Sequence, residues 1–302
     1  MQTNFQRFYR APLPALLALF VVFVWQGLGH TVMILMEQLF GQRWVYPSAL
    51  VIGAFGVWMV WFGKSREELG ATIWGFAGGS LIWTAWIEFS FHYYARRLNI
   101  QPLIEHGQIV TKQEYLLLPS SIGVLLATLV FFFFNKETRC NAFRWLHRTL
   151  RMNPGETSSG AKRDFSSIVA METIFVTWFF YIYLLVLYDP QLGGGDRSIA
   201  AYTSLGIYIA WTVFLGNRLL RFQRMAPAIR YAIPTGIIGW TAVEIAGRWD
   251  LFTSVWEHPS EYGGIMAIVA VALLAALVLS MLSPPRQIRP EEPARPVTDR
   301  PA

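Results

Sequence analysis

The sequence predicts an all-α, polytopic integral membrane protein with about eight transmembrane helices. Of its 302 residues, 54% are hydrophobic and only 15% are charged, whereas soluble domains carry about a quarter charged residues. The apolar residues gather in runs of roughly 20, the length of helix that crosses a bilayer. Lys and Arg lie mainly between alternate runs, as in membrane proteins with one fixed orientation.

Eight apolar runs are long enough, or nearly so, to cross the hydrocarbon core. They cover residues 13–37, 46–63, 70–93, 117–135, 167–188, 198–216, 229–248 and 263–283. The second, fourth and sixth are short, but Trp, Tyr or charged residues flank them, as is usual at a membrane interface. The seventh contains Pro234, Gly236 and Glu244. A membrane domain is therefore expected over residues 13–283.

The distribution of Lys and Arg predicts that both ends of the chain are cytoplasmic. With residues 1–12 inside, 19 of the 25 Lys and Arg residues fall in inner segments. Positive residues concentrate on the cytoplasmic side of membrane proteins, so we expect a multi-pass protein of the inner, or plasma, membrane. This placement makes the lipid bilayer the partner of the basic residues and excludes nucleic acid.

Two cytoplasmic segments differ in composition from the spans. Residues 139–151 place Phe143, Leu146 and Leu150 on one helical face and most of the basic side chains elsewhere. This pattern predicts either an amphipathic helix on the inner leaflet or an ordinary basic connector. The tail, residues 284–302, is rich in Pro and charged residues and is expected to be disordered.

A faint internal repeat relates the third and seventh runs. Residues 83–88 (WTAWIE) are similar to residues 240–244 (WTAVE) if one position is skipped. Runs four apart have the same orientation, so the match suggests a parallel duplication of a four-helix unit, as in some transporters. A chance match between two Trp-rich segments is the alternative.

Several ionisable side chains lie within the predicted spans. A charge near mid-membrane costs about 2.5–3.5 kcal/mol on insertion scales, so such residues are usually paired, buried in the bundle or functional. Glu172 is expected near the inner face. Five others fall near the outer face in the predicted orientation: His30, Glu37, Glu88, His92 and Glu244.

The spacing of Glu88 and His92 predicts a site on one helix face, because residues four apart are neighbours on a helix. A carboxylate and an imidazole so placed can bind a metal ion or form an acid–base pair. The predicted metal ligands are His30, Glu37, Glu88 and His92, and the predicted catalytic groups are Glu88 and Glu244, with His106 and His258 in outer loops as further ligands. The cofactor is left open between a transition metal and haem.

Simpler structural roles exist for the same side chains. Glu88 can pair with Arg96 or Arg248 on a neighbouring turn or helix. His92, next to two tyrosines, can occupy a solvated position at the interface. Glu37 can simply mark the end of its helix.

One short stretch resembles a known family. The pattern Gln26-x-x-x-His30-Thr31 followed by Met36-Glu37-x-Leu39-Phe40 resembles part of the C subunit of copper membrane monooxygenases. Glu88-x-x-x-His92 with His106 resembles that family's other site of Asp and His ligands. The resemblance covers less than a tenth of the chain, needs a gap within a helix, lacks a second histidine after His30 and presents the motifs in reversed order. What it implies is a bound metal.

Three functions stay open on the sequence. The first is a membrane-embedded redox or hydroxylating component with a metal or haem site near the outer leaflet, acting on an apolar small molecule or a quinone. The second is a proton- or cation-coupled transporter or permease that uses Glu88 and Glu244, with the seventh helix broken at Pro234, Gly236 and Gly239. The third is a non-catalytic subunit or assembly factor of a membrane protein partner.

Overall fold

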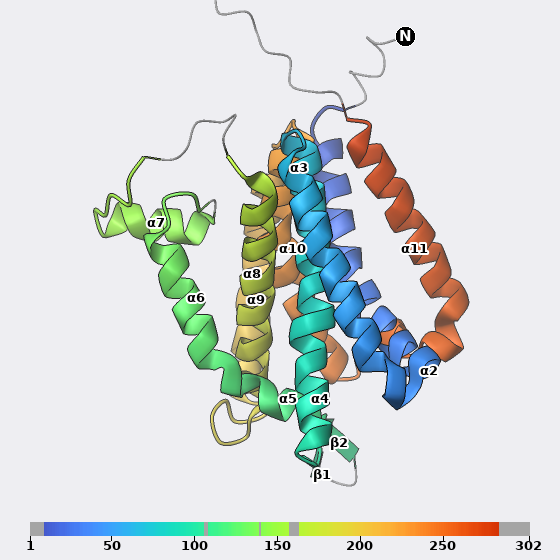
Figure 1. Ribbon diagram of the computed structural model, residues 1–302. Coiled ribbons are helices and arrows are strands. Elements are labelled where there is room, and N and C mark those ends of the chain that lie inside the picture. The colour runs from blue at the N-terminus through green and yellow to red at the C-terminus, as the bar shows by residue number, and fades with distance from the viewer. Residues whose placement is uncertain (1–8, 106–107, 139, 157–162, 284–302) are drawn as a thin grey trace, which may run out of the picture.

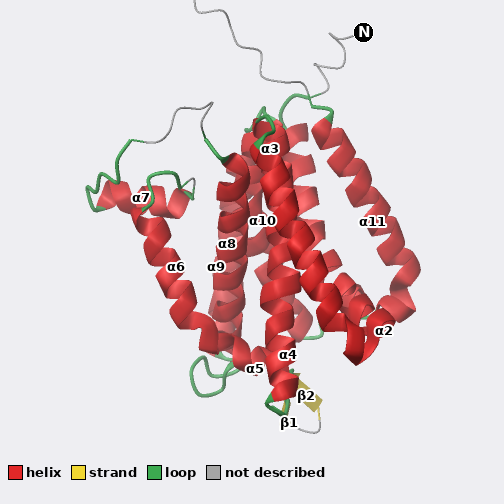
Figure 2. Cartoon of the chain, in the orientation of Figure 1, coloured by secondary structure: helices red, strands yellow, loops and turns green. Residues whose placement is uncertain are grey.

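In the computed structural model the chain forms a bundle of long helices (Figure 1). The structure describes residues 9–105, 108–138, 140–156 and 163–283. The predicted tail, His106 and residues 1–8 lie outside this part. Figure 2 shows helices throughout and one short pair of strands. The all-α class is confirmed.

Five helices in the described part are long and apolar enough to cross a membrane, so this is a multi-pass membrane protein. They are α2 (Leu13–Lys64), the run Gln113–Phe134, α8 (Phe165–Tyr188), α9 (Ile199–Leu219) and α11 (Pro259–Met281). The run Gln113–Phe134 comprises α5 (Gln113–Leu117), the 3₁₀ turn η2 (Leu118–Ser121) and α6 (Ile122–Phe134). The count of eight spans, their orientation and the repeat stay predictions.

Helix α2 holds the first two predicted spans within one helical segment. The sequence predicts a connecting loop between residues 37 and 46, but helical turns continue on either side of Gly41. Gly41 has φ 60° and ψ 178°, a backbone conformation open to glycine and strained for other residues. The chain therefore changes direction at this residue without a loop (Figure 1).

A second long helical segment runs through α3 (Glu68–Ile82), the π-helical turn η1 (Trp83–Glu88) and α4 (Phe89–Arg97). Together with α10 (Met225–Arg248) it covers the third and seventh predicted runs. Helix α3 packs against α8, and α10 packs against the first half of α2. These four helices form the centre of the bundle, around buried residues such as Val22, Phe76, Val169 and Ile229.

Glycines allow the central helices to approach closely. A Cβ atom at Gly79 would lie 2.7 Å from the carbonyl oxygen of Ala170 in α8. A Cβ atom at Gly236 in α10 would lie 2.8 Å from a methyl carbon of Val22 in α2. Small residues at such contacts are typical of helix pairs in membranes, where close packing rather than water drives association.

The predicted break in the seventh span is wrong. Helix α10 continues through Pro234, Gly236 and Gly239 with helical geometry. Proline removes one backbone donor, but membrane helices tolerate this where nearby side chains and neighbouring helices compensate. Only the carbonyl of Arg230, four residues earlier, loses its helical donor, and the absence of a side chain at Gly236 allows the close contact with α2.

The two ends of the bundle differ. Strands β1 (Leu103–Glu105) and β2 (Gln108–Thr111) form an antiparallel hairpin at one end, which we call the hairpin end. The turn η4 (Val255–Glu257) precedes α11. Helix α7 (Asn141–Thr149) lies across the opposite end (Figure 1). There the Tyr9 hydroxyl donates to the carbonyl of Leu279 at 2.7 Å, so the two ends of the described chain lie together.

Candidate functional site

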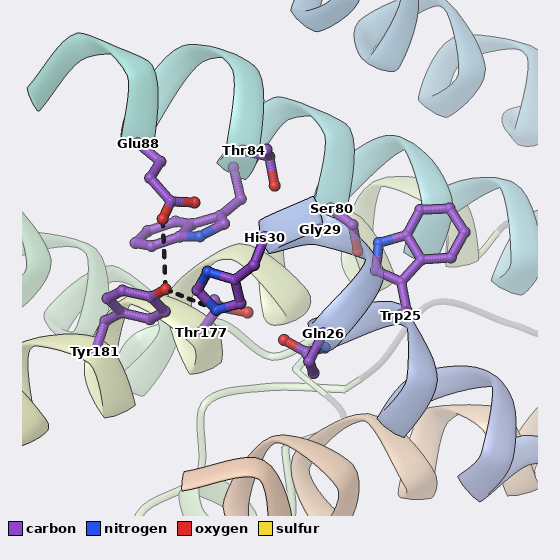
Figure 3. Close-up of a pocket in the computed structure, with 10 residues that line it drawn as sticks. Trp25, Gln26, Gly29, His30, Ser80, Thr84, Glu88, Thr177 and Tyr181 are labelled. Atoms are coloured by element: carbon purple, nitrogen blue, oxygen red, sulfur yellow. Dashed lines mark hydrogen bonds between the residues drawn. The ribbon is translucent and has the colours of Figure 1, made fainter. Parts of the chain in front are cut away.

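Each of the four central helices contributes one polar side chain to a buried network. The Tyr181 hydroxyl, from α8, lies between the Glu88 carboxylate of η1 and the His30 ring of α2 (Figure 3). It donates to Glu88 Oε1 at 3.4 Å and lies 3.2 Å from His30 Nε2. His30 Nε2 in turn lies 3.3 Å from Glu244 Oε1, from α10. The result is a continuous chain of four groups: Glu88, Tyr181, His30 and Glu244.

Aromatic rings hold this chain of four groups in place. The His30 ring stacks with Tyr181 and with Trp240, at centroid separations of 6.3 and 6.4 Å. The Trp240 indole donates to Glu244 Oε1 at 2.6 Å, within one turn of α10. Glu88 is only 3% exposed. The carboxylate of Glu88 is therefore held away from bulk water by packing as well as by its hydrogen bond.

A small polar cavity of about 30 Å³ adjoins the network. It has room for about one water molecule, which needs two to four polar partners to be stable there. Polar side chains face it in Figure 3, among them Gln26, Thr84 and Thr177. The cavity can therefore hold a water molecule beside the chain of four groups.

A second cluster surrounds His92 in α4, toward the hairpin end. His92 Nδ1 lies 3.3 Å from Glu37 Oε1, and Arg96 donates to the same oxygen at 2.7 Å. Arg96 also donates to the Tyr46 hydroxyl at 3.1 Å. On the other side of the ring, His92 Nε2 lies 3.8 Å from Glu114 Oε1. Glu37 is thereby neutralised, whereas Glu114 has no close donor among the described residues.

A larger cavity of about 380 Å³ lies beside this second cluster. Its walls include Glu37, His92, Arg96, Lys112, Glu114 and Glu257. His30 borders both this cavity and the small one. It therefore links the buried network to the larger cavity.

The predicted metal ligands are divided between the two clusters. Glu88 and His30 belong to the central network through Tyr181, and Glu37 and His92 belong to the second cluster. The helices that each side chain faces determine this division. Glu88 faces α8, while His92, one turn later, faces α2 and α5. In the described residues no three His, Cys, Asp or Glu side chains are grouped closely enough to hold a metal ion. A metal or haem stays a prediction.

The simpler structural roles are wrong for Glu88 and His92. Arg96 pairs with Glu37 rather than Glu88. Arg248 faces Asp196, 3.8 Å from its carboxylate, and stacks on Tyr188. His92 is 8% exposed and so is not solvated. Glu37 lies before the break at Gly41 and forms ion pairs. His258 is exposed and does not line either cavity.

Two residues of these clusters are absent from the sequence-based prediction. Tyr181 resembles the many other tyrosines of an apolar helix, and Glu114 stands at the edge of an apolar run, in a predicted loop. No pattern in the sequence distinguishes either residue.

Glu172 lies apart from both clusters, near the α7 end. Its Oε1 accepts hydrogen bonds from the Thr138 hydroxyl at 3.1 Å and from the backbone N–H of Cys140 at 3.0 Å. Glu172 therefore fixes the connection between α6 and α7 to the bundle.

Comparison with known proteins gives a negative result. No protein-family model, curated protein or solved structure matches the chain. The resemblance to copper membrane monooxygenases therefore rests on the quoted residues alone. The site has to be interpreted from its own chemistry.

Proposed function

We propose that the protein is a proton-coupled membrane transporter. The chain Glu244–His30–Tyr181–Glu88 is the observation that carries this proposal, because it combines acid, imidazole and phenol groups at hydrogen-bonding or near hydrogen-bonding distances. Ionisable residues inside a membrane bundle are costly, and chains of Glu and His are typical of proton pathways in pumps and transporters.

The chemistry of each group suits proton transfer. Both contacts of His30 are made at Nε2, which without its hydrogen can accept a proton from Glu244 and then release it to Tyr181, and a phenol can accept and donate at a single oxygen. A proton taken up by Glu244 or His30 can therefore reach Glu88 through the Tyr181 hydroxyl. Since His30 also borders the larger cavity, the cavity is the entrance of this pathway and the place where cargo would bind.

The internal repeat adds independent support. Trp83 and Trp240 are 157 residues apart, as are Gly79 and Gly236, whereas Glu88 and Glu244 are 156 apart. The difference of one residue falls within the π-helical turn Trp83–Glu88, which contains one more residue than an α-helical turn. The position skipped between the two sequence motifs thus has a structural explanation.

Helix packing agrees with the same duplication. Gly79 of α3, in the first half of the chain, lies against α8 in the second half, and Gly236 of α10, in the second half, lies against α2 in the first. Each of these contacts therefore joins one helix from each half. Within this scheme Glu88 corresponds to Glu244, whereas His30 and Tyr181 are 151 residues apart and are not equivalent positions. A site at the interface of two parallel repeats is the arrangement found in several transporter folds.

The proposed topology has eight spans with both ends in the cytoplasm of the inner membrane. The described ends lie at one end of the bundle, which requires an even number of crossings. The hairpin end, with the larger cavity, then faces outward, and α7 lies along the inner leaflet, where its basic side chains meet anionic lipid.

Two other functions rank below transport. A redox or hydroxylating role with a bound metal ion needs a ligand set that the two separate clusters do not supply among the described residues, whereas haem needs only one or two axial ligands. Metal analysis and an absorption spectrum of the purified protein test it directly. A role as a non-catalytic subunit leaves the buried chain of four groups without a purpose.

Proton flux into reconstituted vesicles tests the proposal. Vesicles containing a pH-sensitive dye receive an external acid pulse, with a protein-free small-molecule cell extract outside to supply cargo. We expect the wild-type protein to acidify the lumen faster than protein-free vesicles do. Glu88→Gln and Glu244→Gln should each remove this excess rate.

The control variant is Glu67→Gln, which removes an exposed carboxylate beside the start of α3. It should retain the wild-type rate. Unchanged flux in both Glu88→Gln and Glu244→Gln would rule the proposal out.

A further inference from the structure

Glu114 is a buried carboxylate that lacks a donor. Its side chain is 8% exposed and borders the larger cavity, yet no described residue donates a hydrogen bond to it. The nearest basic group is His92, whose Nε2 lies 3.8 Å away and also has no hydrogen-bond partner in the described structure. Buried polar groups are nearly always satisfied, so the Glu114 carboxylate at this cavity indicates a site for a missing donor.

The charges around the larger cavity favour a cation. Three carboxylates border it, and Arg96 and Lys112 are the two permanently basic side chains there. Arg96 is committed to Glu37 at 2.7 Å. The side chain of Lys112 is exposed, whereas Glu114 is buried. The buried part of the cavity wall is therefore negatively charged. A ligand at this place would be shielded from water, and shielding strengthens an ion pair.

The size and the remaining walls limit the ligand. A volume of about 380 Å³ falls at the lower end of the range of roughly 300–1,000 Å³ that is usual for small-molecule sites. Met33, Ile34 and Pro102 form an apolar part of the wall, and Tyr115 supplies an aromatic ring. Such a site suits a compact apolar body that carries one charged group.

We infer that the larger cavity binds a small organic amine, whose ammonium group donates hydrogen bonds to Glu114. The ammonium also neutralises the carboxylate, and the apolar body of the amine lies against Met33 and Ile34. This inference deepens the proposed function, because the amine is then the cargo whose movement is coupled to protons through His30.

Equilibrium dialysis of the purified full-length protein in detergent tests the inference at pH 7. The probe is radiolabelled phenethylamine, with empty micelles as the blank. Its neutral analogue 2-phenylethanol and its anionic analogue 3-phenylpropanoate compete for the same volume with a different charge. We expect saturable binding of one phenethylamine per chain and at least tenfold weaker competition by either analogue.

Variants locate the bound amine. Glu114→Gln keeps the shape of the side chain and should weaken phenethylamine binding at least tenfold. Glu261→Gln, which removes an exposed carboxylate in the first turn of α11, should bind as the wild type does. The comparison of the three probes on the wild-type protein needs no variant, so it decides the matter even if Glu114→Gln fails to fold.

Three results would overturn the inference: no saturable phenethylamine binding, equal competition by 2-phenylethanol, or unchanged affinity in Glu114→Gln. Failure of the proposed function has a different signature. Glu88→Gln and Glu244→Gln should bind phenethylamine normally while losing proton flux. If both variants bind phenethylamine normally and also keep the wild-type proton flux, the transporter proposal is contradicted. The inference of an amine site is then unaffected.

Discussion

Single residues decide how the bundle handles buried charge. Glu88 and Glu172 are both carboxylates within long apolar helices, but their partners differ. Glu88 meets a phenol that leads on to an imidazole, whereas Glu172 accepts from a hydroxyl and a backbone N–H. The first arrangement can pass a proton along, and the second holds a loop.

Cys140 gives a test at this scale, since it is the only cysteine and lies outside the long helices. Burial raises the pKa of the Cys140 thiol, and the thiolate is the reactive form. Maleimide should therefore label Cys140 several-fold more slowly at pH 7.5 than it labels an exposed cysteine in an unstructured peptide. Because the pKa is raised, the labelling rate should still be increasing at a pH where the rate for the peptide has levelled off.

The hydrogen bond from the Cys140 N–H to Glu172 provides the comparison variant for this labelling experiment. Glu172→Ala removes the acceptor of the Cys140 N–H and should increase the labelling rate. Equal rates for wild-type protein and peptide at every pH would show that the segment is not packed as described.

Helices are positioned by small residues and by one irregular turn. Gly79 brings α3 onto α8, and the π-helical turn places Glu88 toward Tyr181. Hydrophobic runs predict where helices lie, because length and polarity alone determine a span. They do not predict which face of a helix meets which neighbour, and for that reason the partners of Glu88 and His92 had to come from the structure.

Substitution of Gly79 tests the closest of these contacts. Gly79→Ala introduces a methyl group 2.7 Å from the Ala170 carbonyl oxygen, and such overpacking costs about 1–3 kcal/mol. Gly216→Ala in α9, where nothing lies within 4 Å, should be neutral or stabilising by up to about 1 kcal/mol. Unfolding of the two variants in detergent measures the difference. Equal stability would mean that α3 and α8 do not approach as described.

The π-helical turn predicts an unusual tolerance of deletion. Removing Trp86 converts the turn to regular α-helix and keeps Glu88 on its original face, because the turn holds one extra residue. Removing Leu81 from the regular part of α3 rotates all later residues by about 100°. Although loss of Trp86 also removes its hydrogen bond to the Leu50 carbonyl, its deletion should leave more folded protein in size-exclusion chromatography. The reverse order would contradict the assignment of the turn.

Some features of the whole molecule can be predicted from the sequence, and others depend on how the helices pack. Composition and apolar runs predict a helical multi-pass membrane protein, and the structure agrees. That His30, Glu88 and Glu244 lie at one level of the bundle could also be predicted, since position along a span sets this level. Their grouping through Tyr181, and the separation of His92 into another cluster, depend on helix rotation and packing. One hydrophobic pattern permits many such arrangements.

The most direct test of the account is proton flux in Tyr181→Phe vesicles. This change removes only the hydroxyl that lies between His30 and Glu88, and loss of such a hydrogen bond costs about 0.5–1.5 kcal/mol of stability. Tyr183→Phe is the matched control, because the Tyr183 hydroxyl lies two residues further along α8 and bonds to Ser204 at 2.7 Å. We predict that Tyr181→Phe lowers proton flux to the rate of protein-free vesicles while Tyr183→Phe keeps the wild-type rate. A wild-type rate in folded Tyr181→Phe would contradict the account.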